Sequence, residues 1–210
     1  MTMNNEMLVT KKGKAMWTHI NEPEMYNGEP KGYTVQIMLS KEDTDELIGI
    51  LNGILNDAKK DIKFKGKGWS SEPFMGIHED KDGNILFKFK ANTSYKDKDG
   101  VIHDISIPVF DSKGNPFPKG TNIGNGSIIR VAFTPTPFNV NKRINGLSLR
   151  LNSIQVVKLV PYGNNDNNAK AFGFSVEEDG YVAPPTDTTT TDEDEPVVPP
   201  IEDDNDFADF

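Results

Sequence analysis

Short runs in which apolar and polar residues alternate recur along residues 32–160, and this period of two is typical of half-buried β-strands. In the first run, Tyr33, Val35 and Ile37 alternate with polar neighbours. The strand-like runs are residues 32–39, 84–95, 101–110, 127–134 and 146–160. Short strands at this spacing predict a small β-barrel or a β-sandwich.

The last run changes parity along its length. Its buried face is expected to carry two groups of apolar residues: Leu147, Leu149 and Leu151, then Ile154 and Val156 on the opposite parity. A β-bulge near Asn152 and Ser153 would bring both groups to one face, and bulges are common where a barrel strand bends.

The tetrapeptide Asp-Lys-Asp-Gly occurs twice between strand-like runs, at 80–83 and 97–100. Aspartate and glycine favour tight turns, so both copies predict hairpins. Neither copy has the remaining ligand positions of a calcium-binding loop.

A helix is predicted after Ser40, where early acidic residues and later lysines suit the helix dipole. Its apolar residues have helical spacing: Leu47, Ile48, Ile50, Leu51, Ile54, Leu55 and Ala58. We expect this wide stripe to close one end of a barrel. The predicted fold is therefore mainly β, a five-stranded OB-fold barrel with one accessory amphipathic helix. An immunoglobulin-like sandwich is the alternative, which the long helix disfavours.

Charge divides the chain. The net charge is −9, yet residues 177–210 hold 13 acidic residues and no basic ones, and residues 1–176 have a net charge of +4. From Pro184 the sequence has few large apolar residues and predicts disorder. We expect an OB-fold domain at 1–161, a linker with a candidate short strand at 162–183, and a disordered acidic tail at 184–210. A cationic body with an acidic tail favours nucleic-acid binding.

No catalytic constellation is evident. The chain has no cysteine, and His19, His78 and His103 lack the spacing of metal ligands. We therefore expect no enzymatic activity, no cofactor and no metal. The run His78-Glu79-Asp80 keeps a metal-dependent nuclease as a remote alternative. Without a membrane-spanning run or an apolar signal sequence, the protein is expected in the cytoplasm, with no membrane partner.

Binding to single-stranded DNA requires cations along the phosphates and flat side chains on which bases stack. The predicted DNA-binding residues are Lys63, Lys65, Lys67, Trp69, Lys88, Lys90, Tyr95, Arg130, Phe138, Lys142, Arg143 and Arg150. Two interpretations of Trp69 stay open, base stacking and partial burial in the core. Trp17 and Tyr26 are weaker stacking candidates.

The stretch GSIIRVAFTPTPFNVNKRINGLSLRLNSIQVVKLV at 126–160, preceded by KFKANTSY and IPVFDSKGNP, resembles the single-stranded DNA-binding proteins of tailed bacteriophages. This resemblance implies an OB barrel, a groove lined by basic and aromatic residues, and a cytoplasmic location in the infected bacterial host. Family members end in an acidic stretch with a terminal aromatic residue. The matching residues here are Asp203, Asp204, Asp206, Phe207, Asp209 and Phe210.

The expected function is sequence-independent binding of single-stranded DNA in phage replication, recombination or repair. We expect the tail to compete for the DNA groove and to recruit phage DNA polymerase, helicase or recombination proteins. A homodimer is a further candidate assembly. The alternative is a protein-interaction or chaperone-like β module that binds no nucleic acid.

Overall fold

The computed structural model describes residues 6–161. The linker and the acidic tail predicted at 162–210 lie outside the described residues. In chain order the elements are β1 (Leu8–Val9), β2 (Gly13–Tyr26), β3 (Glu29–Met38), α1 (Lys41–Lys60), the 3-10 helix η1 (Ile62–Phe64), β4 (Ile77–Glu79), β5 (Ile85–Ala91), β6 (Ser94–Lys96), β7 (Ile102–Asp104), β8 (Val109–Phe110), β9 (Ile128–Asn139) and β10 (Asn145–Lys158).

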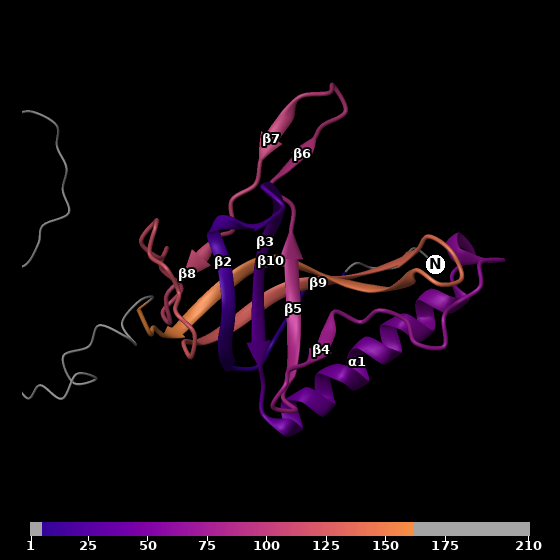
Figure 1. Cartoon of the computed structure of the whole chain (residues 1–210), viewed down its shortest axis with the longest axis horizontal. Coiled ribbons are helices and arrows are strands. Elements are labelled where there is room, and N and C mark those ends of the chain that lie inside the picture. Colours follow the sequence, from indigo (N-terminus) through magenta and orange to yellow (C-terminus); the bar gives the residue numbers. More distant parts are fainter. Residues whose placement is uncertain (1–5, 162–210) are drawn as a thin grey trace, which may run out of the picture. The chain divides into compact units, whose positions relative to one another are not determined.

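Strands β9, β2, β3, β5 and β10 form a closed barrel, because β10 pairs with both β5 and β9 (Figure 1). Strand β10 runs parallel to β5 and antiparallel to β9, and the β2–β3 and β3–β5 pairs are antiparallel. Three short strands extend the sheet: β1 pairs with β9, β4 with β5, and β8 with β10. The predicted mainly β fold with a five-stranded barrel and a helix is confirmed.

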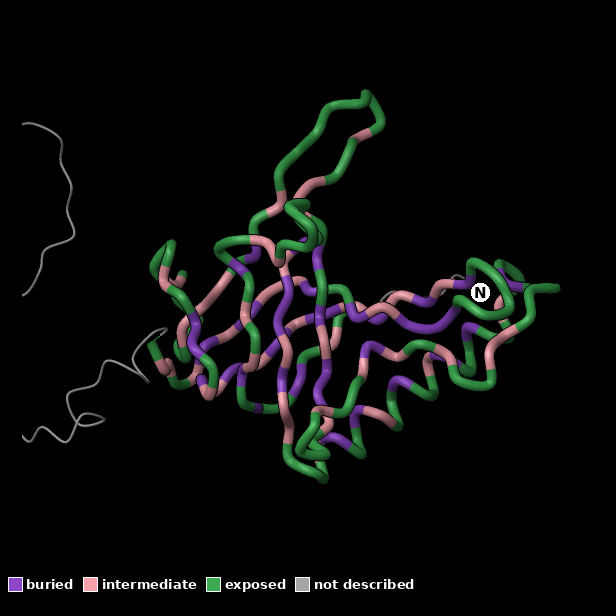
Figure 2. Tube along the Cα trace, viewed as in Figure 1, coloured by how far each residue is buried: buried purple, intermediate pink, exposed green. Residues whose placement is uncertain are grey.

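The alternating sequence pattern produces the core. In β9, Ile129, Val131 and Phe133 are fully buried, while the residues between them face outward. Phe89 of β5 packs on Phe133 with ring centroids 4.9 Å apart. Figure 2 shows the buried positions alternating along the barrel strands. Burial of each such side chain stabilises the fold by about 1.5–3 kcal/mol, which is why the alternation determines the strands.

The predicted bulge in β10 is confirmed. The register against β9 shifts between Leu151 and Ser153, so that Ile154 joins the same buried face as Leu149 and Leu151.

Helix α1 begins where its sequence predicts. The Ser40 hydroxyl accepts a hydrogen bond from the Asp43 backbone N–H at 3.1 Å and caps the helix. Leu47, Leu51 and Leu55 belong to the same core cluster as the barrel strands. Ile50, which the sequence analysis placed on the apolar stripe, is instead 42% exposed, because it points away from that cluster.

Both predicted hairpins are present. Asp80 and Asp97 each accept hydrogen bonds from backbone N–H groups two and four residues later, in the turns that join β4 to β5 and β6 to β7. Asp111 makes the same turn, which the sequence analysis did not single out.

The prediction of one strand over 101–110 is wrong, because β7 pairs with β6 in a separate two-stranded arm and β8 pairs with β10.

The ends of β9 and β10 from Pro135 to Leu149 project beyond the barrel as a finger (Figure 1). The loop that follows η1 lies against this finger, where Phe74 forms a bridge to Gly146. Gly146 has φ +146, and a Cβ at this position would collide with the Phe74 backbone. Only glycine permits this close approach.

Within residues 6–161 no helix has the length and apolar character needed to cross a bilayer.

Candidate nucleic-acid interface

A row of side chains crosses the outer face of the barrel. Sheet register pairs His19 with Thr34, Thr34 with Lys90, and Lys90 with Arg150, so one row runs from β2 to β10. Residues that face each other in register point to the same side of a sheet. We call His19, Thr34, Lys90 and Arg150 the cationic row.

Lys90 and Arg150 are exposed, and within the described residues neither is ion-paired. Like charges on directly neighbouring strands repel one another. An anion bound between them would relieve that repulsion, so the row is arranged to accept a phosphate.

Lys88 has a different environment from Lys90, although both face outward on β5. Its Nζ lies 2.9 Å from Oε2 of Glu24 on β2, and both side chains are partly buried. The hydrogen bond from Lys88 holds the pKa of the Glu24 carboxyl below its ordinary value. Lys88 is therefore already neutralised and contributes less free positive charge than Lys90.

A second group of cations gathers where the loop after α1 meets the finger. Lys67 Nζ donates to the Asn139 carbonyl oxygen at 2.9 Å, and Asn139 Nδ2 donates to the Gly68 carbonyl oxygen at 3.0 Å. The side chain of Lys142 lies over Gly68. These contacts bring Lys67 and Lys142 together. Lys63 and Lys65 lie in and just after η1, and Arg143 follows Lys142 in the sequence. We call Lys63, Lys65, Lys67, Lys142 and Arg143 the finger cluster.

Aromatic side chains lie beside this cluster. Phe74 and Phe138 have ring centroids 6.2 Å apart, and Phe74 is 56% exposed. Trp69 is half-buried, with its ring edge-on to Phe64 at 5.6 Å. The structure thus favours partial burial of Trp69, and Phe74 offers the more open stacking face.

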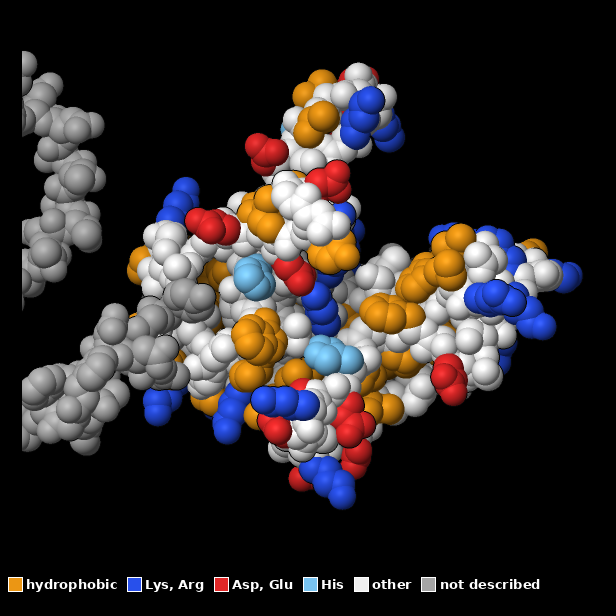
Figure 3. All heavy atoms as spheres, in the orientation of Figure 1, with side chains coloured by type: hydrophobic (Ala, Val, Ile, Leu, Met, Phe, Trp, Pro, Cys, Tyr) orange, Lys and Arg blue, Asp and Glu red, His pale blue; other side chains and the backbone are white. Residues whose placement is uncertain are grey.

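The space-filling view shows basic side chains in a column over the barrel and again at the end of the finger and helix (Figure 3). Apolar side chains lie between these two basic regions. Cations that flank flat apolar groups are the arrangement that single-stranded nucleic acids require.

The family model described as "Single-stranded DNA-binding protein, Bacteriophage T7" matches residues 54–159, half of the chain. The chain belongs to this family.

Individual relatives agree with the family match. The single-stranded DNA-binding protein of Escherichia phage T7 is 32% identical over 111 residues, which cover 52% of this chain and 47% of that protein. The chain thus matches about half the length of the T7 protein. The corresponding protein of Enterobacteria phage T3 is 28% identical over 189 residues, covering 80% of this chain and 81% of that protein.

Solved structures have the same fold. The crystal structure of gp2.5 from bacteriophage T7 matches with a TM-score of 0.58 and 24% identity, covering 85% of this chain and 99% of that chain. The single-stranded DNA-binding protein of bacteriophage Enc34 in complex with single-stranded DNA matches with a TM-score of 0.55 and 16% identity, covering 75% and 89%. The predicted OB-fold is therefore confirmed.

In this family member the twelve predicted DNA-binding residues do not form one surface. Lys90 and Arg150 lie in the cationic row, Lys88 lies next to it, and the lysines and arginine of the finger cluster lie with Trp69 and Phe138. Tyr95 lies on the β6–β7 arm, where its ring stacks on His103 at 5.1 Å. Arg130 faces β1 instead, and its Nε donates to the Thr10 carbonyl oxygen at 3.2 Å.

Two exposed aromatic residues were missed or ranked low. Phe74 gave no sequence signal, because its place on the finger depends on a bridge to Gly146, which lies 72 positions later in the printed sequence. Trp17 is 56% exposed and has φ +49, a conformation that sequence patterns do not predict for tryptophan.

Proposed function

We propose that this chain binds single-stranded DNA with little sequence preference. The observation that carries the proposal is the unneutralised pair Lys90 and Arg150, which sheet register places side by side on the outer barrel face. The finger cluster supplies a second group of cations, where the loop after α1 meets the finger. Cations of this kind release counterions from phosphates, so the binding should weaken steeply as salt rises.

Exposed aromatic rings supply selectivity for unpaired strands. Each base stacked on a ring such as Phe74 adds about 1–3 kcal/mol, and stacking requires a base face that a duplex hides. Because only the unpaired form is bound, the protein would melt secondary structure in DNA by mass action. The proposed function is stoichiometric binding and not catalysis.

Fluorescence titration tests this proposal. The chain has two tryptophans, Trp17 and Trp69, and the first is well exposed. Adding oligothymidine should quench their emission, more strongly at low salt, whereas duplex DNA should quench it little. Equal responses to the two DNAs, or no response to either, would contradict the proposal. The latter result would favour the protein-interaction or chaperone-like β module.

We propose for the acidic tail the role of a competitor for the DNA-binding surface. Residues 177–210 carry 13 negative charges, opposite in sign to the body. Removing them should tighten binding to single strands, mostly at low salt, where screening is weakest. An unchanged or weaker affinity would refute this role.

The same tail is proposed to recruit proteins of phage DNA replication, recombination or repair, such as a polymerase or helicase, inside the infected bacterium. Asp206, Phe207, Asp209 and Phe210 would offer aromatic rings among acids to a basic pocket on such a partner. Deleting Phe210 alone should leave DNA binding nearly intact and weaken capture of the partner. Equal loss of both would assign Phe210 a role in folding. Sedimentation of the full chain would test the proposed homodimer.

A further inference from the structure

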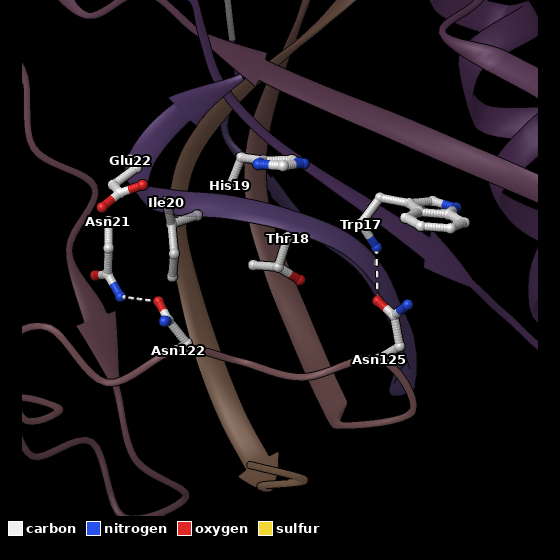
Figure 4. Close-up of a pocket in the computed structure, with 8 residues that line it drawn as sticks. All are labelled: Trp17, Thr18, His19, Ile20, Asn21, Glu22, Asn122 and Asn125. Carbon is white, nitrogen blue, oxygen red and sulfur yellow. Dashed lines mark hydrogen bonds between the residues drawn. The ribbon is translucent and has the colours of Figure 1, made fainter. Parts of the chain in front are cut away.

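A slot lies in the barrel wall between β2 and residues 121–125, and it has a volume of about 510 Å³. Figure 4 shows Thr18 and Ile20 turned toward this slot, with Trp17 and His19 on the other side of β2. The volume lies within the range of roughly 300–1,000 Å³ that is usual for small-molecule sites.

Hydrogen bonds of asparagine side chains link β2 to residues 121–125 at the two ends of the slot. The Trp17 backbone N–H donates to Asn125 Oδ1 at 2.9 Å, and Asn21 Nδ2 donates to Asn122 Oδ1 at 2.8 Å (Figure 4). Asn21 Nδ2 also donates to the Thr121 carbonyl oxygen at 3.1 Å. Within the described residues, no backbone-to-backbone hydrogen bond joins β2 to residues 121–125.

This arrangement leaves polar groups without protein partners. Strand β2 pairs with β9 only at Gly13 and Lys14, so its backbone edge faces the slot from Thr18 onward. The Thr18 hydroxyl is buried and, in the part of the chain that the structure describes, has no hydrogen-bond partner. A buried polar group without a hydrogen-bond partner destabilises the fold, and a polar ligand that pairs with it would remove that cost.

Trp17, at the edge of the slot, has a strained backbone and an exposed ring. Its φ of +49 is costly for a residue with a large side chain, and its side chain is 56% exposed. Backbone strain of this kind concentrates at functional sites. The contact with Asn125 fixes the strained turn and so fixes the ring beside the slot.

The slot adjoins the proposed path of the DNA. His19 lines the slot and is also the first member of the cationic row that continues to Lys90 and Arg150. A strand whose phosphates follow this row would therefore reach β2 on the face opposite Thr18 and Ile20, and a base turned around the β2 edge that is not paired with β9 would enter the slot.

We propose that the slot binds one unstacked nucleobase of the bound strand and prefers guanine. Amides and an open strand edge match the alternating donors and acceptors of a base edge. Glu22 supplies the preference, because a carboxylate accepts two hydrogen bonds from the adjacent N1–H and 2-amino groups of guanine. This inference rests on the proposed single-strand binding and adds a base-selective subsite to it.

Competition between oligonucleotides tests the subsite in the full-length chain. The probes are oligothymidine and the same oligomer with one central guanine, hypoxanthine or adenine. Guanine should bind about tenfold more tightly than thymine, since one good bidentate contact gives discrimination of this order. Hypoxanthine, which lacks the 2-amino group, should lose most of this preference.

The variant Glu22→Gln should bring the guanine preference within about twofold of unity and leave thymine-only affinity nearly unchanged. Glu29→Gln is the matched control, because Glu29 is exposed on β3 and pairs with Lys31 outside the slot. The control should retain the preference. Equal tightening of all oligomers by both variants would reveal a general charge effect and overturn the proposal.

Fluorescence provides a second measurement. In a Trp69→Phe variant Trp17 is the sole indole, and guanine-containing strands should quench it more than thymine-only strands. If wild type binds all four oligomers equally, the subsite is refuted while single-strand binding stands. If wild type binds none of them, the proposed function is refuted and the subsite with it.

Discussion

Replacing Lys90 and Arg150 together by alanine should reduce both the affinity for single strands and its dependence on salt. Each phosphate-contacting cation contributes about 0.7 to the slope of log affinity against log salt for a single strand. Loss of two lowers the slope by about 1.4, so the affinity deficit should shrink about sevenfold between about 50 and 200 mM salt. Both side chains are exposed, so stability should change little.

Anisotropy of a labelled oligothymidine, measured at several salt concentrations, gives the slope directly. The control replaces Lys81 and Lys113, which are exposed in the turns begun by Asp80 and Asp111. The control removes the same charge and should keep the wild-type slope. A deficit that stays constant with salt would mean that the two cations do not contact phosphates, and equal slope changes in both variants would indicate a general charge effect.

Three further changes test other parts of the structure. Glu24→Gln frees Lys88, so the salt slope should rise by about 0.7. Because the folded-state pKa of Glu24 is lowered, its carboxylate stabilises the fold fully above the ordinary carboxyl pKa, and this contribution is lost as pH falls through the lowered pKa. The melting temperatures of the variant and the wild type should therefore converge only below the lowered pKa, and a difference that persists in strong acid would contradict the assignment. Phe133→Ala should lower the free energy of unfolding in urea by about 3–5 kcal/mol, since the ring is fully buried against Phe89; a loss under about 1 kcal/mol would not fit that packing. Ser40→Ala should cost about 1 kcal/mol by the same assay through loss of the helix cap, and Ser40→Asp should restore it.

The features that the sequence predicts well depend on neighbours only a few residues apart. Alternation determines which face of β5 is buried, an Asp-x-x-Gly string determines a turn, and Ser40 determines where α1 begins. For the same reason the outward direction of Lys90 and Arg150 was predictable, because each sits between buried neighbours in its strand.

Long-range register was not predictable from these patterns. The sequence does not indicate that Arg150 lies beside Lys90, because that contact requires β10 to run parallel to β5. Residues 101–110 carry β-branched or aromatic side chains in both halves, yet the two halves pair in different sheets. The strain at Trp17 likewise depends on a tertiary contact, the hydrogen bond to Asn125.

Strand β10 links barrel closure to assembly of the site. Its pairing with β5 and β9 closes the barrel, the same pairing places Arg150 beside Lys90, and its first residues hold the Phe74 loop through Gly146. An unfolded chain therefore lacks the proposed interface. A ligand that binds only the folded form stabilises it by about 2.7 kcal/mol at a concentration one hundred times the Kd. Binding of single strands and closure of the barrel are thus thermodynamically coupled through β10, and a change that weakens the β5–β10 pairing should weaken DNA binding even where it touches no cation.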